Sequence, residues 1–141
     1  MIKKLQEKIL NSNKLSHAFS SLIGEKIAMD LGTANTLVYT KEKGIVIDEP
    51  SFVALNVENG NSILAVGQRA KDMFGRTTSK IKTIRPMKDG VIADFVVTEE
   101  MIKHFIKKVH KRSTFANPRI LIAVPTGSTP VERKAIQDSA L

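Results

Sequence analysis

An aspartate stands at the end of an apolar run in the stretch "KIAMDLGTANTLVYTK", residues 26–41. Gly32 and Thr33 follow it, and a second run with β-branched and aromatic residues comes after them. A carboxylate at such a turn either hydrogen-bonds its own backbone or faces a cation. Cation binding is therefore the chemistry that Asp30 could perform. The surrounding residues have to decide between this role and a structural turn.

The small residues after Asp30 are compatible with a phosphate site that includes a metal ion, although "DLGT" alone favours a structural turn over such a site. Gly32 lets backbone amides approach a bound group closely, and oriented amides bind anions such as phosphate. Asp30 would repel phosphate unless a cation lies between them, and Mg²⁺ bridges carboxylates and phosphates while keeping most of its waters. Thr33 and Asn35 could add hydrogen bonds. Taken alone, "DLGT" leaves a purely structural turn as the alternative.

Length and composition indicate a globular domain. The chain has 141 residues, enough for one ordinary domain with a core. It is 42% apolar and 26% charged, and it contains no cysteine, which excludes disulfides and thiolate metal sites. It has no apolar run of about 18 residues, the length that a membrane-spanning helix needs.

The net charge of +8 could favour nucleic acid, an anionic membrane surface or anionic ligands. The positive charge is spread along the chain, with one cluster at residues 103–112, and aromatic residues do not interleave with it. We therefore expect no nucleic-acid partner. The cluster is interpreted as a solvated helix face and the C-terminal end of that helix.

Residues 1–25 differ from the rest of the chain, because apolar residues recur there at helical spacing with lysines among them. Such a basic amphipathic segment can lie in a membrane interface. It can equally pack on its own domain or fray as a terminus. The apolar residues are Ile2, Leu5, Ile9, Leu15, Phe19 and Leu22.

Short β-prone runs fill most of residues 26–66. The runs "KIAMDL", "NTLVYT", "GIVIDEP" and "SFVALNV" predict strands, broken at Pro50, which cannot donate to a ladder. Two further β-prone runs flank Asn59 and Gly60, the pair favoured in a tight hairpin turn. "QRAKDMFGR" predicts a short helix capped by Gly75.

A strong helical pattern starts at Thr98, which suits the N-cap, with Glu99 and Glu100 complementing the helix dipole. "PRILIAVPTG" then has the apolar run typical of a buried strand. Three strands, a mixed insert, and then helix, strand and helix predict an α/β layered domain.

The last helix has two agreeing start signals. Thr129 and Glu132 form a capping box, and Pro130 occupies the first helical position. The helical pattern is still running at Leu141, so we expect later elements to cover its apolar face and the chain to be a piece of a longer protein.

Several longer segments are typical of one known family: "IAMDLGTANTLVY", "GIVIDEPS", "AVGQRAKDMFGRT", "IRPMKDGVIADF", "MIKHFIKKVH" and "VPTGSTPVERKAI". Together they make the chain resemble the MreB family of bacterial actin-like, rod-shape-determining proteins, from about residue 27 to its last residue. "DLGTANT" and "RPMKDGVIADF" are specific to this family. The shorter Asp-x-Gly-Thr pattern is shared with actins, chaperones and sugar kinases.

The resemblance implies an actin-like ATPase (ribonuclease H-like) α/β fold, here an incomplete first lobe with an inserted small α+β subdomain. Residues 26–55 and 98–141 would form the larger subdomain, and residues 56–97 the inserted one, which makes filament contacts. ATP and Mg²⁺ would bind in the cleft between two lobes, with Asp30 acting through the water shell of the metal. The residues matching the first phosphate loop are Asp30, Gly32, Thr33, Ala34 and Asn35.

The resemblance also implies homopolymeric filaments in the cytoplasm, peripheral on the inner face of the cell membrane. Such filaments direct cell shape by guiding the cell-wall elongation machinery. The family binds membrane through an N-terminal amphipathic helix or a hydrophobic loop. Residues 1–23 match the helix, and "STFANP" with Phe115 matches the loop.

The chain departs from the family pattern in what it lacks. The motif with the catalytic glutamate, the second phosphate loop, the adenosine pocket and the second lobe are missing, and Glu132 belongs to the capping box. We therefore expect no catalytic residue in this chain, weak or absent nucleotide binding, and no useful hydrolysis.

Two other functions stay open on the sequence alone. The chain could be a complete, short, membrane-attached interaction module without nucleotide hydrolysis. It could also be another member of the superfold, such as a chaperone or sugar kinase, although "RPMKDGVIADF" argues against that.

Overall fold

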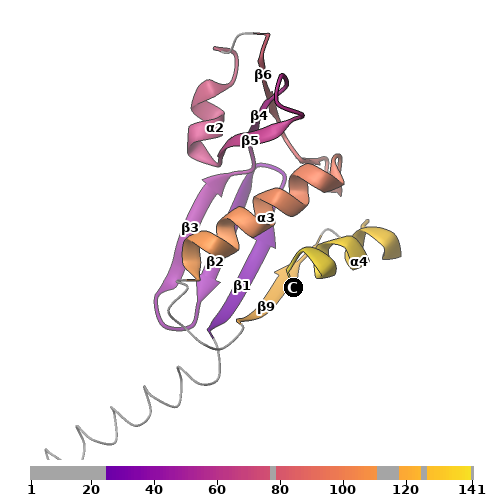
Figure 1. Ribbon diagram of the computed structural model, residues 1–141. Helices are drawn as coiled ribbons and strands as arrows, with labels where there is room; N and C mark the ends of the chain where they lie inside the picture. Colours follow the sequence, from indigo (N-terminus) through magenta and orange to yellow (C-terminus); the bar gives the residue numbers. More distant parts are fainter. Residues whose placement is uncertain (1–24, 77–78, 111–117, 125–126, 141) are drawn as a thin grey trace, which may run out of the picture.

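The computed structural model describes residues 25–76, 79–110, 118–124 and 127–140. Within them, a larger sheet carries two helices on one face, and a smaller sheet with a short helix lies at one end (Figure 1). The elements are β1 (Lys26–Leu31), β2 (Asn35–Thr40), β3 (Gly44–Pro50), β4 (Val53–Asn56), β5 (Ser62–Val66), α2 (Gln68–Met73), β6 (Ile81–Ile84), β7 (Met87–Lys88), β8 (Val91–Ile92), α3 (Phe95–Val109), β9 (Arg119–Ala123) and α4 (Pro130–Ser139).

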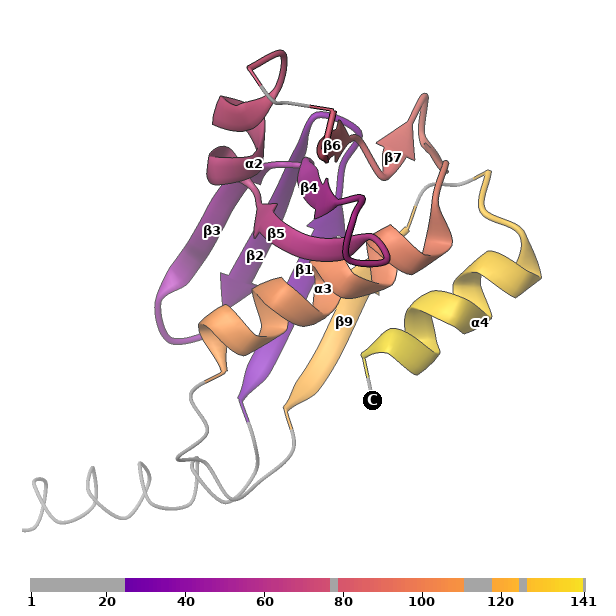
Figure 2. The same cartoon turned by 45° about the horizontal axis from the view of Figure 1, so that its top comes forward.

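The larger sheet has the strand order β3-β2-β1-β9. β1 pairs antiparallel with β2, β2 antiparallel with β3, and β1 parallel with β9. The alternation in β1 buries Ile27, Met29 and Leu31, which join one hydrophobic cluster with Phe105 of α3 and Ile136 of α4. Figure 2 shows α3 crossing this face of the sheet, with α4 beside it. The α/β layering predicted from the order of elements is confirmed.

The prediction that β9 is a buried strand was wrong. Its side chains alternate between exposed and half-buried, and Leu121 is 72% exposed. Within the described residues, β9 ends the strand order, and α3 and α4 pack against the opposite face of the sheet. An apolar run cannot reveal whether both faces of a strand are covered, because that depends on neighbouring elements.

The smaller sheet has the order β5-β4-β6, with both pairs antiparallel. Phe52, Ala54 and Ala70 form its own small hydrophobic cluster, which joins the sheet to α2. The predicted glycine after this helix is confirmed, since Gly75 follows the C-cap residue and has φ +73°. β4 begins at Val53, within the range assigned from sequence to the larger subdomain, so the division at residue 56 stays a prediction.

The hairpin between β4 and β5 exists, but the predicted two-residue turn at Asn59 and Gly60 was wrong. The connection spans residues 57–61, and the residues with positive φ are Gly60 (65°) and Asn61 (62°). Ala54 pairs with Ala65, a register that would centre a two-residue turn on the predicted pair. A β-bulge between Ala54 and Leu55 then shifts the register by one residue, so the two-residue turn cannot form.

α3 begins four residues earlier than the sequence indicated, at Phe95 instead of Glu99. Its N-cap is Asp94, whose Oδ1 accepts a hydrogen bond from the Val97 amide at 3.1 Å. Thr98, the predicted N-cap, is buried inside the helix and donates its hydroxyl to the Asp94 carbonyl at 2.6 Å. Both residue types cap helices well, and Asp94 lies earlier in the chain. The prediction of Thr98 as the N-cap was therefore wrong.

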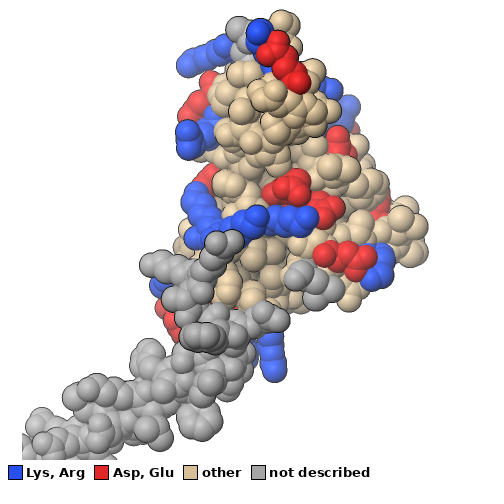
Figure 3. All heavy atoms as spheres, in the orientation of Figure 1, with Lys and Arg blue, Asp and Glu red and all other residues tan. Residues whose placement is uncertain are grey.

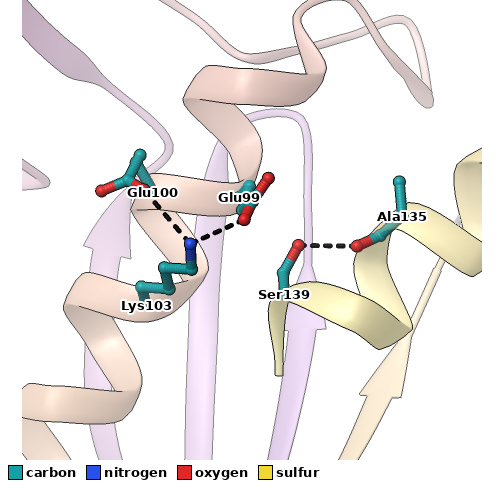
Figure 4. Close-up of polar contacts among 5 residues, drawn as sticks. All are labelled: Glu99, Glu100, Lys103, Ala135 and Ser139. Atoms are coloured by element: carbon teal, nitrogen blue, oxygen red, sulfur yellow. Dashed lines mark hydrogen bonds and ion pairs between the residues drawn. The ribbon is translucent and has the colours of Figure 1, made fainter. Parts of the chain in front are cut away.

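The shifted helix start moves Glu99 and Glu100 out of the first turn, so they do not complement the dipole there. They pair instead with Lys103, which donates to Glu99 at 2.6 Å and to Glu100 at 3.4 Å (Figure 4). Glu99 raises the pKa of Lys103 above its ordinary value. Figure 4 also shows Ser139 of α4, whose hydroxyl donates to the Ala135 carbonyl at 2.7 Å.

Basic and acidic side chains lie next to one another across the middle of the face drawn in Figure 3. Lys103, in the basic cluster, forms ion pairs with two glutamates of the same helix. Exposed ion pairs of this kind contribute little to stability, typically less than about 1 kcal/mol. Mixed charge on this face of α3 favours a solvated helix, and the absence of a nucleic-acid partner stays a prediction.

The capping box of α4 is confirmed. The Thr129 hydroxyl accepts from the Glu132 amide at 3.2 Å, and the Glu132 carboxylate accepts from the Thr129 amide at 2.6 Å. Pro130 is the first residue of the helix, as predicted.

Replacing Thr129 with alanine should lower the free energy of unfolding by about 1 kcal/mol, the usual cost of losing an N-cap. Urea unfolding followed by circular dichroism would measure this. Glu132→Gln is the matched control, because glutamine also completes a capping box, and it should cost only a few tenths of that amount. Equal losses in the two variants would contradict the role of the Thr129 hydroxyl.

Candidate functional site

Asp30 is placed near the end of β1, where the sequence put it, but the strand continues one residue further to Leu31. Asp30 pairs with Leu37 of β2 and with Ala123 of β9. Its side chain is exposed on the sheet face opposite to the buried Met29. A carboxylate in this position is open to solvent and to a ligand.

Gly32 follows directly and makes the tightest contact of the loop between β1 and β2. A Cβ built on this glycine would lie 2.4 Å from the backbone oxygen of Asn35. Real Cβ atoms essentially never approach another heavy atom so closely, so only glycine fits this loop unchanged. The structure thus gives a physical reason for the glycine of "DLGT".

Thr33 connects this loop to a second one. Its Oγ1 accepts a hydrogen bond of 3.0 Å from the amide of Gly90, in the turn between β7 and β8. That turn carries two successive residues in the left-handed region, Asp89 with φ 51° and Gly90 with φ 74°. The motifs "DLGTANT" and "RPMKDG" are therefore in direct contact, although the contact residues are 57 positions apart.

Ser51 was missed by the sequence analysis. It is fully buried just after β3, and its Oγ donates to the Gly32 carbonyl at 2.7 Å. Its amide donates to the Ala34 carbonyl at 2.9 Å, and its Oγ lies 3.0 Å from Oγ1 of Thr36. The only signal in the sequence is a small hydroxyl residue after the proline that breaks the strand.

Ala34 and Asn35 are exposed at the outer side of the loop. The Asn35 side chain donates its Nδ2 to Oδ1 of Asp48, on β3, at 2.8 Å. Among the described residues, no acceptor is found for the amides of Thr33 and Ala34. Free, neighbouring amides beside an accessible surface are what an anion-binding loop requires.

The residues of this loop fit Mg²⁺ bound together with phosphates. Among the described residues, no three His, Cys, Asp or Glu side chains gather into a group that could hold a metal alone. Mg²⁺ does not need such a group, because one or two carboxylates, phosphate oxygens and waters complete its coordination. An exposed Asp30 and two neighbouring amides that have no acceptor among the described residues would provide the protein's share.

The residues predicted to contact membrane lie outside the described part of the chain. Within the residues that the structure describes, no helix has both the length and the apolar content to cross a bilayer. The undescribed membrane residues are Ile2, Leu5, Ile9, Phe19, Leu22 and Phe115.

Comparison with solved structures places this architecture among known folds. The crystal structure of MreB5 of Spiroplasma citri bound to AMPPNP matches with a TM-score of 0.69 and 38% sequence identity. The match covers 83% of this chain and 35% of that one. The same protein bound to ADP gives a TM-score of 0.70. The fold is therefore that of a part of an actin-like protein.

The family follows from the sequence comparisons. The family model described as "MreB/Mbl protein" matches residues 24–141. The chain belongs to the MreB/Mbl family, which confirms the resemblance found in its motifs.

Curated relatives agree with this assignment. The chain is 53% identical over 126 residues to the cell shape-determining protein MreB of Escherichia coli K12, covering 86% of this chain and 36% of the relative. It is 54% identical over 119 residues to the cell shape-determining protein Mbl of Bacillus subtilis 168, covering 84% and 35%. The chain thus spans about a third of the length of these relatives.

Proposed function

We propose that this chain is the N-terminal part of a bacterial actin-like cytoskeletal protein that binds ATP with Mg²⁺ and forms membrane-associated filaments. Its role is to direct cell shape by guiding cell-wall synthesis. The observation that carries the proposal is the loop of residues 30–35, with its exposed carboxylate and free amides. Relatives named as cell shape-determining proteins support the cellular role.

The loop would hold the phosphates of the nucleotide. The amides of Thr33 and Ala34 would donate to phosphate oxygens, and Asp30 would hold Mg²⁺ through its waters. Bound Mg²⁺ would neutralise phosphate charge that otherwise repels this carboxylate. The complexes of MreB5 of Spiroplasma citri with AMPPNP and ADP support a nucleotide as the ligand.

The smaller subdomain, residues 56–97, would make filament contacts. Exposed apolar side chains there support this assignment, among them Leu64 (44% exposed) and Phe74 (59% exposed). Residues 1–25 and Phe115 would attach the filament to the cytoplasmic face of the membrane, beside the cell-wall elongation machinery. A basic amphipathic segment suits an anionic lipid surface.

The proposal predicts weak but localised binding of Mg-ATP to this chain. Its dissociation constant should be about 1 mM or higher, corresponding to at most about −4 kcal/mol, because one lobe supplies only part of the contacts. Hydrolysis should not be measurable above background. Amide chemical shifts in ¹⁵N-correlated NMR spectra, recorded during a titration with Mg-ATP, would map the site to residues 30–35.

Asp30→Asn is the control for the metal-dependent part of binding. It should reduce the response to Mg-ATP while leaving the spectrum of the free protein largely unchanged elsewhere. Shifts confined to other residues, or none at all, would contradict nucleotide binding and favour the interaction module without nucleotide. A micromolar dissociation constant would contradict the expectation that one lobe is insufficient.

A further inference from the structure

We propose that Ser51 is a positioning residue that sets the conformation of the phosphate loop. The relevance of this inference to ligand binding rests on the proposed function. Ser51 lies 19 positions from Gly32, yet it hydrogen-bonds the backbone of the loop twice. Its side-chain hydroxyl donates to the Gly32 carbonyl, and its backbone amide donates to the Ala34 carbonyl.

The direction of the hydrogen bonds follows from counting protons. A serine hydroxyl has one hydrogen, and Ser51 donates it to the Gly32 carbonyl at 2.7 Å. In the contact of 3.0 Å between the two hydroxyls, Thr36 must then donate and Ser51 must accept. The result is one ordered chain of hydrogen bonds from Thr36 through Ser51 to Gly32.

The two hydroxyl groups of this hydrogen-bond chain are closed to solvent, and its bond to the Gly32 carbonyl is partly buried. Ser51 and Thr36 are both 0% exposed, so water cannot take the place of a lost hydroxyl without a rearrangement. A partly buried carbonyl that loses a donor fixed beside it is left unsatisfied on that side, which is costly. We therefore expect the Gly32 carbonyl to turn away if Ser51 loses its hydroxyl, and the loop to turn with it.

The two bonds from Ser51 fix the direction of two loop carbonyls and, through the peptide planes, the direction of the loop amides. The carbonyls of Gly32 and Ala34 are both drawn toward the connection between β3 and β4. Because the C=O and N–H of a trans peptide point in opposite directions, the Thr33 amide points away from Ser51. Among the described residues no acceptor is found for the amides of Thr33 and Ala34, which stay available to an anion.

The test compares Ser51→Ala with Thr36→Val in the 141-residue chain. Ser51→Ala removes the donor to Gly32, whereas Thr36→Val removes a hydroxyl of the same buried pair but keeps that donor. The first readout needs no ligand: the three-bond amide-to-Hα couplings of Thr33 and Ala34, which report φ. We expect these couplings to change in Ser51→Ala and to stay at their wild-type values in Thr36→Val.

The second readout is the initial slope of the Thr33 and Ala34 amide shifts against Mg-ATP concentration. It should fall about five- to tenfold in Ser51→Ala, the effect of one hydrogen bond, and less than about twofold in Thr36→Val. Ser51→Cys, with similar shape and a weak donor, covers the case in which the alanine variant does not fold. It should change both readouts in the same direction, by less.

The outcomes separate this inference from the proposed function. Unchanged couplings in Ser51→Ala, or equal changes in Thr36→Val, would overturn the role of Ser51, even if wild-type protein binds Mg-ATP at the loop. Selective changes in the couplings would support that role, even if wild-type protein shows no response to Mg-ATP. In that last case the proposed nucleotide binding by this chain fails, and Ser51 remains the residue that shapes the loop.

Discussion

Replacing Gly67 with alanine is expected to lower the free energy of unfolding by about 3 kcal/mol, the upper end of the cost of one strained backbone position. Gly67 has φ +73° and ψ −136°, a conformation that alanine rarely adopts. A Cβ there would also lie 1.8 Å from Oε2 of Glu49. Urea unfolding followed by circular dichroism measures the loss.

The substitution would also break a connection between the larger sheet and α2. Oε2 of Glu49, on β3, accepts from the amide of Gln68, the first residue of α2, at 3.2 Å. Oε1 of the same carboxylate forms an ion pair with Nζ of Lys108 on α3. A side chain at Gly67 would displace the carboxylate from both partners, so the attachment of α2 to the larger sheet should weaken.

Gly60→Ala is the matched control for backbone strain. Gly60 also has positive φ, +65°, but a Cβ there would meet no atom within 4 Å. Its replacement should cost about 1 kcal/mol, from conformation alone. Equal losses at the two glycines would show that Glu49 adds nothing. Adding Glu49→Ala to the Gly67 variant should restore part of the stability, as expected for coupled neighbours.

Sequence patterns were reliable where the interacting residues are close along the chain. The capping box at Thr129 needs only a threonine and a glutamate three residues later, and the structure contains it. Gly75 ends α2 for an equally local reason. The class of fold followed from the order of such elements together with the family motifs.

The same patterns failed where two local solutions compete or where a distant element decides. Asp94 and Thr98 are both good caps, and the choice between them depends on how the preceding chain approaches the helix. The hairpin at residues 57–61 depends on a bulge in the ladder, which turn residues do not encode. The exposure of Leu121 depends on what covers the sheet.

The residues of the candidate site differ in the same way: those in a short motif were predictable, and those with long-range contacts were not. Asp30 and Gly32 were predictable because a short, contiguous motif contains them. Ser51 and Gly90 were not, because their contacts with the loop span 19 and 57 positions. The sequence therefore predicts which residues would meet a phosphate, and the structure adds which residues hold them in place.

Replacing Gly32 with alanine should therefore disrupt the loop itself. The clash at 2.4 Å is with the backbone oxygen of Asn35, not with a flexible side chain, so the loop backbone has to move. That movement would carry the Gly32 carbonyl away from the Ser51 hydroxyl. We expect a loss of about 1–3 kcal/mol in the free energy of unfolding, the cost of strain at one position together with an unmade buried hydrogen bond.

The effect on the ligand should be larger than the effect on stability. The response of the Thr33 and Ala34 amides to Mg-ATP should fall at least about tenfold. Both the hydrogen bonds of these amides to phosphate and the orientation of the amides are affected. Gly127→Ala is the matched control in a second loop, since its Cβ would lie at an ordinary 3.8 Å from Cγ1 of Val91. An undiminished response in the Gly32 variant would mean that the phosphates bind elsewhere, because no anion can use these amides once the loop has moved.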